Sequence, residues 1–325
     1  MKRLKKPAVG ILIAAVLLLI FPNLLPNTYA VRIVNMIGIY IILSTGMNIL
    51  VGYTGQLSMG QAAFYGIGAY ATALLNTRLG LPFLITFPLS LLITAGFGLI
   101  LAIPALKLKG GYLALLTIGF GEVIRLLLVN WVDLTKGPSG ITGIDTISLF
   151  GFQVNSSVQW YYIILAVVVV GLIYQKIVME SRSGRAFIAI REDDKAAELT
   201  GIDITKYKII AFVTSAVYCS IAGVIYAQMT GYVSPDTFTS NDSNIILWTV
   251  IIGGMGTQFG PVAGGIIMVI LPELLRSMGT MRMVIFGVLL MIVIIFYPSG
   301  LTPFLKQIWQ RFKAGRQKRK TPTET

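Results

Sequence analysis

The chain has 325 residues, of which 55% are hydrophobic and only 12% are charged, and its mean hydropathy is +0.80. Such a composition excludes an ordinary soluble globular protein. The sequence contains no histidine and a single cysteine, Cys219, which argues against zinc sites, hydrolytic triads and a disulfide framework. We therefore predict an all-α, polytopic helical membrane protein, because apolar runs such as 85–103 and 160–173 are suited to cross a bilayer as helices.

Positive charge is concentrated at the two ends of the chain. The net charge is +13, and basic residues flank the apolar region at Lys2, Arg3, Lys5, Lys6, Lys306, Arg311, Lys313, Arg316, Lys318, Arg319 and Lys320. Lysine and arginine beside apolar spans mark their cytoplasmic ends, so both termini are expected in the cytoplasm, with some attraction to anionic membrane lipid. This distribution favours a topological role over nucleic-acid binding.

The apolar segments predict about ten spans, with eight as the lower bound. In chain order they cover about 8–21, 31–50, 58–76, 84–105, 112–131, 160–178, 208–229, 244–254, 261–276 and 281–297. The segment 244–276 could instead be a re-entrant pair, and a signal peptide ending at Ala30 is the alternative to an uncleaved first span. We divide the chain into a transmembrane domain, 1–305, with a cytoplasmic loop at 179–208, and a basic cytoplasmic tail, 306–325.

The stretch 180–208 is the one long, densely charged interruption between the predicted spans. Acidic residues that include Asp193 and Asp194 stand where a helix would start, and Gly201 stands where it would stop. This pattern predicts a short helix over 193–200. Its small or apolar side chains, Ala196, Ala197 and Leu199, could sit in a groove on another protein. The alternative is an ordinary solvated loop.

Glycines and uncharged polar residues lie together near the third predicted span, and they are candidates for the wall of a translocation path. They are Gln56, Ser58, Gly60, Gln61 and Gly66. Polar backbone at membrane depth is tolerated where it lines a cavity, and amide groups could hold a zwitterion without a fixed charge. Close helix packing is the alternative, and packing is favoured for Gly256, Gly260 and Gly264. The two glycine-rich breaks, near 52–60 and 253–260, could be related halves.

Two opposite charges, Glu122 and Arg125, lie within the fifth predicted span. A separation of three residues places them on one helix face, where they can pair. Charges within a membrane are costly and are often functional, so both could contact the amino and carboxylate groups of a substrate. The alternative, which we favour, is a mutually neutralising pair that faces another subunit.

Several stretches resemble the LivM-type permeases, which are the membrane subunits of branched-chain amino acid ABC importers. The charged stretch and its continuation, SRSGRAFIAIREDDKAAELTGIDITKYKIIAFVTSA, resembles their cytoplasmic loop. Similar matches are GYTGQLSMGQAAFYGIGAYATALL, GGYLALLTIGFGEVIR, GPSGITG, IIGGMGTQFGPVAGG and FGVLLMIVIIFYPSGL, which together cover most of 30–301. Ala196, Ala197 and Gly201 match the coupling motif Glu-Ala-Ala-x-x-x-Gly, but Lys195 replaces its glutamate.

The resemblance implies a permease subunit in a bacterial plasma (inner) membrane, with the charged loop docked on an ATPase. The implied partners are a second permease of related sequence, two ABC ATPase subunits and an extracytoplasmic substrate-binding protein. The implied cargo is leucine, isoleucine or valine, with other amino acids, urea or short amides as alternatives. The sequence itself has no G-x-x-x-x-G-K-[ST] phosphate loop, so we expect no cofactor on this chain and ATP on the partner subunits.

Two other classes of protein compete with an importer subunit. A self-sufficient ion-coupled carrier or channel would need proton or sodium ligands within the membrane, and Glu122 is the acidic residue placed inside the fifth predicted span. A membrane-bound enzyme would need a catalytic grouping, and no nucleophile–base pair is recognisable in the sequence.

Overall fold

The computed structural model describes residues 18–22, 27–149, 152–279, 281–296 and 300–302. Its long helices are α2 (Thr28–Met47), α3 (Gln61–Thr77), α4 (Phe83–Ala105), α5 (Gly111–Asn130), α7 (Ser157–Glu180) and α10 (Ile204–Thr230). A π-helical turn (Asn48–Tyr53) extends α2. The shorter helices are α6 (Val132–Thr135), α8 (Arg182–Glu192), α9 (Asp194–Leu199), α11 (Ser240–Gly253), α12 (Gly260–Leu274) and α13 (Met281–Phe296). The predicted all-α polytopic class is confirmed.

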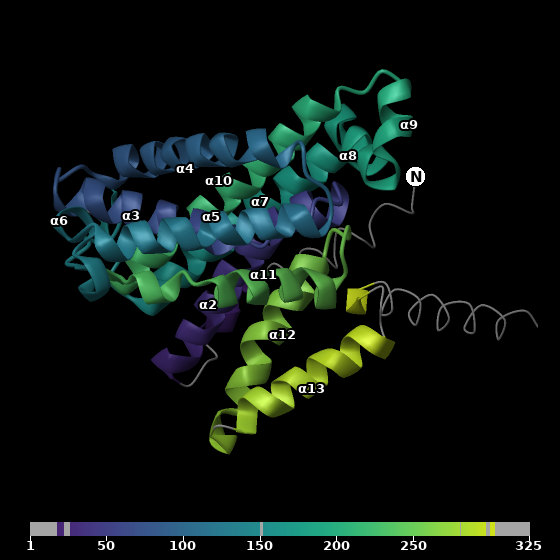
Figure 1. Ribbon diagram of the computed structural model, residues 1–325. Coiled ribbons are helices and arrows are strands. Elements are labelled where there is room, and N and C mark those ends of the chain that lie inside the picture. The colour runs from purple at the N-terminus through teal and green to yellow at the C-terminus, as the bar shows by residue number, and fades with distance from the viewer. Residues whose placement is uncertain (1–17, 23–26, 150–151, 280, 297–299, 303–325) are drawn as a thin grey trace, which may run out of the picture.

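The long helices form a bundle with two different ends (Figure 1). Helices α3, α4, α5, α7 and α10 lie along one direction, with α8 and α9 at one end and α6 at the other. Helix α10 is mostly buried and packs against α2, α3 and α4. The outward faces of α4, α5 and α7 are exposed and apolar, as expected of helices that face lipid or other subunits.

Glycines allow a close helix contact between α3 and α10. A Cβ atom on Gly68 would lie 2.6 Å from Ser220 Cα, and one on Gly223 would lie 2.8 Å from the Ala69 nitrogen. Hydroxyl groups add polar links, because Thr94 on α4 lies 3.0 Å from the Ser220 hydroxyl. Small residues and interhelical hydrogen bonds hold membrane helices together where the hydrophobic effect between helices is weak.

Among the described residues, five helical segments are long and apolar enough to cross a membrane: Thr28–Tyr53, Phe83–Ala105, Gly111–Asn130, Ser157–Glu180 and Ile204–Thr230. Each corresponds to a predicted span, and α3, at 17 residues, also lies where a span is predicted. Helices α11, α12 and α13 have 14, 15 and 16 residues and lie at the last three predicted spans. The first predicted span falls largely outside the described residues, of which 18–22 are helical. The count of ten stays a prediction.

Polar segments from different parts of the sequence meet at the α6 end of the bundle. Strand β1 (Ile141–Thr142), from the α6–α7 connection, pairs antiparallel with β4 (Tyr232–Val233), which follows α10. A hairpin joins β2 (Ser148–Leu149) and β3 (Phe152–Gln153). At the opposite end, the α4–α5 turn contacts α9 through Lys109 and Asp194. This grouping agrees with the predicted alternation, in which α6 is external and α8–α9 is cytoplasmic.

Candidate functional site

The predicted cytoplasmic loop is itself helical. It contains the expected short helix, α9, and also α8, which charge patterning alone did not predict. The signal for α8 is present in the sequence, because Ala186, Phe187 and Ile190 recur at helical spacing and are all buried. The Phe187 ring packs edge-on against Tyr207 at 6.1 Å between centroids. Packing against α10 therefore holds α8 to the membrane part of the chain.

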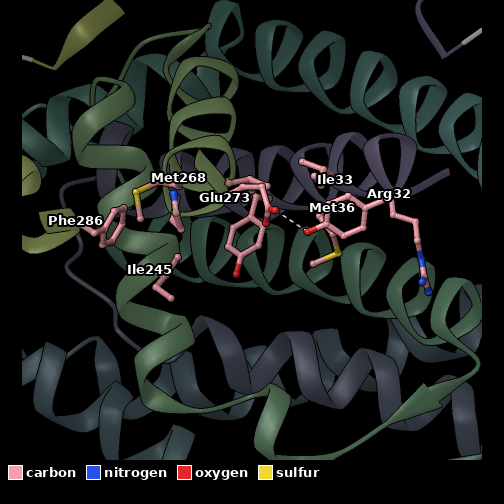
Figure 2. A pocket seen from close by; sticks show the side chains of 11 residues that line it. Arg32, Ile33, Met36, Ile245, Met268, Glu273 and Phe286 are labelled. Atoms are coloured by element: carbon pink, nitrogen blue, oxygen red, sulfur yellow. Dashed lines mark hydrogen bonds between the residues drawn. The ribbon is translucent and has the colours of Figure 1, made fainter. Parts of the chain in front are cut away.

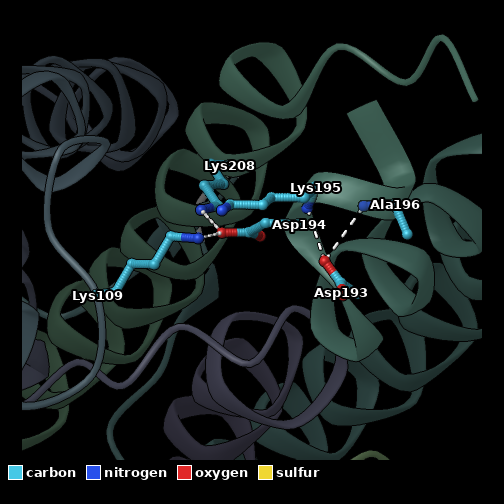
Figure 3. Close-up of polar contacts among 6 residues, drawn as sticks. All are labelled: Lys109, Asp193, Asp194, Lys195, Ala196 and Lys208. Atoms are coloured by element: carbon cyan, nitrogen blue, oxygen red, sulfur yellow. Dashed lines mark hydrogen bonds and ion pairs between the residues drawn. The ribbon is translucent and has the colours of Figure 1, made fainter. Parts of the chain in front are cut away.

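Helix α9 has a defined start and stop. The Asp193 carboxylate accepts hydrogen bonds from the backbone nitrogens of Lys195, at 2.8 Å, and Ala196, at 3.2 Å (Figure 3). These bonds satisfy amides that have no partner within the helix. Gly201 follows the helix with a φ of +84°, a left-handed conformation that favours glycine. Asp193 and Gly201 thus fix the two ends of α9.

Asp194 ties α9 to the membrane helices (Figure 3). One of its oxygens lies 2.9 Å from the Lys208 ammonium, at the start of α10, and 2.5 Å from the Lys109 ammonium, in the α4–α5 turn. The Lys208 side chain is 8% exposed and that of Asp194 is 17% exposed, whereas that of Lys109 is 66% exposed. The buried part of the contact is therefore the pair between Asp194 and Lys208.

The protonation of Asp194 follows from these contacts. Burial alone would raise its pKa, but the hydrogen bonds and charges of Lys109 and Lys208 outweigh burial and hold the pKa of Asp194 below its ordinary range. A carboxyl group with a lowered pKa contributes stability that is complete above its unfolded-state pKa and is lost as the pH falls through its folded-state pKa.

We expect the α8–α9 segment to stay attached at all pH values from about 5 to 8 and to loosen only below about pH 4. Hydrogen exchange of residues 194–208 in the purified protein, measured from below about pH 4 up to about pH 8, tests the expectation. Loss of protection already at about pH 6 would contradict it, because Asp194 would then titrate above its ordinary pKa.

The remaining residues of α9 divide into a buried side and an exposed side. Ala197 is 4% exposed and packs within this chain. Leu199 is 89% exposed, and Lys195 and Ala196 are also exposed. We call Lys195, Ala196 and Leu199 the α9 outer face. The α9 outer face thus presents one large apolar side chain, Leu199, that the described part of the chain leaves almost uncovered.

The candidate residues of the third span are mostly packed. Gln61 is fully buried; its Oε1 accepts from the Ser215 hydroxyl at 3.2 Å and its Nε2 donates to the Ser58 hydroxyl at 3.4 Å. A Cβ atom on Gly60 would lie 2.6 Å from the Thr117 carbonyl oxygen, and one on Gly66 would lie 3.0 Å from the Phe238 ring. Close packing accounts for both glycines, because Gly60 lies against α5 and Gly66 against Phe238, in the segment that precedes α11.

Gln56 has different surroundings from the other four. It is 5% exposed, and its Nε2 has no hydrogen-bond partner among the described residues. It lines a cavity of about 340 Å³ at the α8–α9 end of the bundle, together with Thr54, Gly55, Lys109, Arg191, Asp194 and Lys208. The structure thus brings a candidate path residue next to the helix predicted to dock an ATPase.

Glu122 and Arg125 contact each other on the exposed face of α5. Arg125 Nη2 lies 2.6 Å from Glu122 Oε1, and Arg125 Nε lies 3.0 Å from Glu122 Oε2. The side chains are 43% and 28% exposed, respectively. The pair is therefore neutralised within the helix. It lies on a surface that is open to another subunit or to a path between subunits.

A larger cavity of about 480 Å³ lies between α2, α11, α12 and α13 (Figure 2). Its walls are mostly apolar, with Met36, Ile245, Met268 and Phe286 among them. Near one end, the Tyr29 hydroxyl donates to Glu273 at 2.6 Å. None of the apolar residues of this cavity is a candidate from the sequence, because single apolar side chains in a membrane helix carry no distinguishing pattern.

Several long apolar helices, packed against one another through small residues, define a polytopic helical membrane protein as the class of protein. The comparisons give the family. Residues 29–296 match the family described as branched-chain amino acid transport system / permease component, and the chain belongs to this family. Such a protein is multi-pass and resides in the inner (plasma) membrane.

The most similar relatives include the high-affinity branched-chain amino acid transport system permease protein LivM of Salmonella typhimurium. It is 37% identical over 300 residues, which cover 85% of this chain and 71% of the relative. LivM of Escherichia coli is 36% identical over 291 residues, covering 82% and 68%. A probable branched-chain amino acid transport permease protein LivM of Methanocaldococcus jannaschii is 25% identical over 320 residues, covering 82% and 91%. No solved structure matches the chain.

Proposed function

We propose that this chain is the membrane-spanning permease subunit of an ATP-driven importer of leucine, isoleucine and valine. The family match over 29–296 and the names of the LivM relatives carry this proposal. We further propose a second permease of related sequence, two ABC ATPase subunits and an extracytoplasmic binding protein as partners. The chain binds no cofactor in this proposal, because ATP binds to the ATPase subunits.

The contact with the ATPase, in this proposal, is the α9 outer face. Leu199 supplies an exposed apolar anchor, and Asp193, Asp194 and Gly201 hold the helix that presents it. Ala197 packs inside this chain, so a large residue there would disturb α9 itself rather than the docking contact alone. Leu199 is accordingly the position at which docking can be tested without that complication.

Leu199→Arg is expected to reduce retention of the ATPase subunits on the purified permease, and leucine uptake with it, by roughly tenfold or more, because the variant places a charge in an apolar interface. The matched control is Leu79→Arg, at the opposite end of the bundle, where the leucine is 65% exposed. The measurement is co-purification of the full complex from cells that express the chain together with the proposed partner subunits. Equal ATPase retention by wild type and Leu199→Arg would remove α9 as the docking helix.

The bonded geometry of Glu122 and Arg125 favours mutual neutralisation over substrate contact. A single neutral substitution leaves one charge without its partner inside the membrane, whereas the double substitution leaves none. We therefore expect Glu122→Gln/Arg125→Gln to retain more leucine uptake than either single variant. Uptake by the double variant as low as that of the single variants would instead assign both side chains to the substrate.

An ion-coupled carrier is the second candidate, and the same pair argues against it. The carboxylate of Glu122 is bonded to Arg125 and so is not free to bind a proton or a sodium ion. Other cargoes stay open within the importer class, because substrate choice would rest largely with the binding protein. A binding screen of amino acids, urea and short amides on that receptor decides among them.

A further inference from the structure

The two glycine-rich breaks of the chain lie against each other at the α8–α9 end of the bundle. Asn48, in the π-helical turn after α2, accepts from the Gly256 nitrogen at 2.8 Å and donates to the Thr257 carbonyl oxygen at 2.9 Å. A Cβ atom on Gly52 would lie 2.6 Å from the Gly256 nitrogen. The break after α2 and the α11–α12 turn are therefore in direct backbone contact.

One side chain from α8, that of Arg191, lies between these two breaks. Arg191 Nη1 donates to the Gly52 carbonyl oxygen at 2.5 Å. A Cβ atom on Gly256 would lie 2.7 Å from the same nitrogen, and one on Gly55 would lie 3.1 Å from Arg191 Cγ. Gly55 and Gly256 have φ values of +72° and +70°, so their backbone also favours glycine. Two glycines from distant segments, Gly55 and Gly256, thus make room for one arginine, which bonds to the carbonyl oxygen of a third, Gly52.

The contact has a clear physical cause. A helix leaves the carbonyl groups of its last turn without partners, and α2 ends in a π-helical turn at Tyr53 before an irregular stretch. Arginine near a helix end can bond such carbonyls. Arg191 is the last basic residue of α8, and α8 is followed directly by Asp193, the residue that caps α9. A displacement of α9 is therefore transmitted to Gly52 and Gly256 through very few bonds.

We propose that the two breaks form the inner gate of the translocation path and that Arg191 is the positioning residue that couples this gate to α9. This proposal rests on the proposed function, because it takes α9 as the helix that receives movement from the ATPase. Segments that are joined by a few bonds at helix ends can separate without unfolding the helices on either side. The cavity beside Gln56, which Gly55 and Arg191 also line, lies next to this contact.

A purely structural role of Arg191 would give a different result from a coupling role. If Arg191 only stabilises the fold, its removal lowers the thermal stability of the complex and reduces ATPase retention and leucine uptake together. If Arg191 couples α9 to the gate, its removal leaves the complex assembled and the ATPase active, but ATP hydrolysis no longer drives transport. The number of leucine molecules imported per ATP hydrolysed is therefore the informative quantity.

The experiment uses the full complex in proteoliposomes with the binding protein, radiolabelled leucine and ATP. We expect Arg191→Gln to retain its ATPase subunits and to hydrolyse ATP, while leucine imported per ATP falls at least tenfold; Arg191→Lys, which keeps a charged donor, should be intermediate. The matched control is Arg185→Gln on the same helix, because Arg185 donates to the Glu180 carbonyl of its own segment. Arg185→Gln should match wild type.

A second readout follows the gate itself. In a Cys219→Ser background, Thr54→Cys places a thiol at a position that is 2% exposed and lines the cavity. ATP turnover should accelerate maleimide labelling of this thiol when Arg191 is present and should not do so with Arg191→Gln. An unchanged leucine-to-ATP ratio in Arg191→Gln would overturn the proposal, and so would joint loss of ATPase retention and uptake. Absence of ATP-driven uptake by the wild-type complex would instead contradict the proposed function.

Discussion

Replacing Asp194 by alanine is expected to release α9 from the membrane helices. The substitution leaves the Lys208 ammonium, whose side chain is only 8% exposed, without its close carboxylate. Removing one partner of a buried ion pair costs about 3–5 kcal/mol, and the remaining exposure of Asp194 places the expected loss near the lower figure, about 3 kcal/mol. Hydrogen exchange of residues 194–208 should then be roughly a hundredfold faster, and retention of the ATPase subunits should fall.

Lys109 provides the matched control for Asp194. It contacts the same carboxylate, but its side chain is 66% exposed. Exposed ion pairs contribute about 1 kcal/mol or less, so Lys109→Ala should have little effect on exchange or on ATPase retention. Equal effects of Asp194→Ala and Lys109→Ala would contradict the assignment of the pair between Asp194 and Lys208 as the anchor of α9.

Replacing Gly223 by leucine is expected to abolish the folded permease. A Cβ atom there would meet the Tyr65 carbonyl oxygen and would lie 2.8 Å from the Ala69 nitrogen. These are backbone atoms of a packed helix and cannot move aside as a flexible side chain can. Overpacking a core costs about 1–3 kcal/mol even when side chains can adjust, and the cost is higher where two helix backbones must separate.

The measurement for Gly223 is the yield and thermal midpoint of the detergent-solubilised protein, with Gly96→Ala as the control. Gly96 lies on the exposed face of α4, and nothing lies within 4 Å of the Cβ atom that alanine would add. Alanine is also the better helix former, so this control should be as stable as wild type or slightly more so. Normal yield and stability of Gly223→Leu would show that α3 and α10 do not cross as closely as described.

The long helices could be predicted from sequence because an apolar run in a membrane has few alternatives to helix. The predicted spans at 84–105 and 112–131 agree with Phe83–Ala105 and Gly111–Asn130 to within about one residue. The predicted end of the second span, near 50, was three residues short, because the chain continues through a π-helical turn to Tyr53. Propensity and apolar runs do not reveal such a turn, since its residues Gly52 and Asn48 bond to distant parts of the chain, Arg191 and Gly256 respectively.

The candidate site could be predicted only in part. The acidic residues and the glycine around 193–201 were sufficient to predict α9, because helix ends are specified by local residues. The partners of Asp194 were not predictable, since Lys109 and Lys208 become its neighbours only through packing of distant segments. The contact between the two glycine-rich breaks depends on tertiary structure in the same way. The sequence singled out their glycines, but the arginine between them became apparent only from the structure.

Uptake of radiolabelled leucine into proteoliposomes tests the central claim most directly. The chain is reconstituted with the second permease and the ATPase subunits proposed above, ATP is placed on the ATPase side, and the proposed binding protein is placed on the opposite side. We expect uptake that requires ATP and every one of these subunits, and that Leu199→Arg lowers by roughly tenfold or more. Leucine uptake by this chain alone, without ATPase subunits or ATP, would contradict the account.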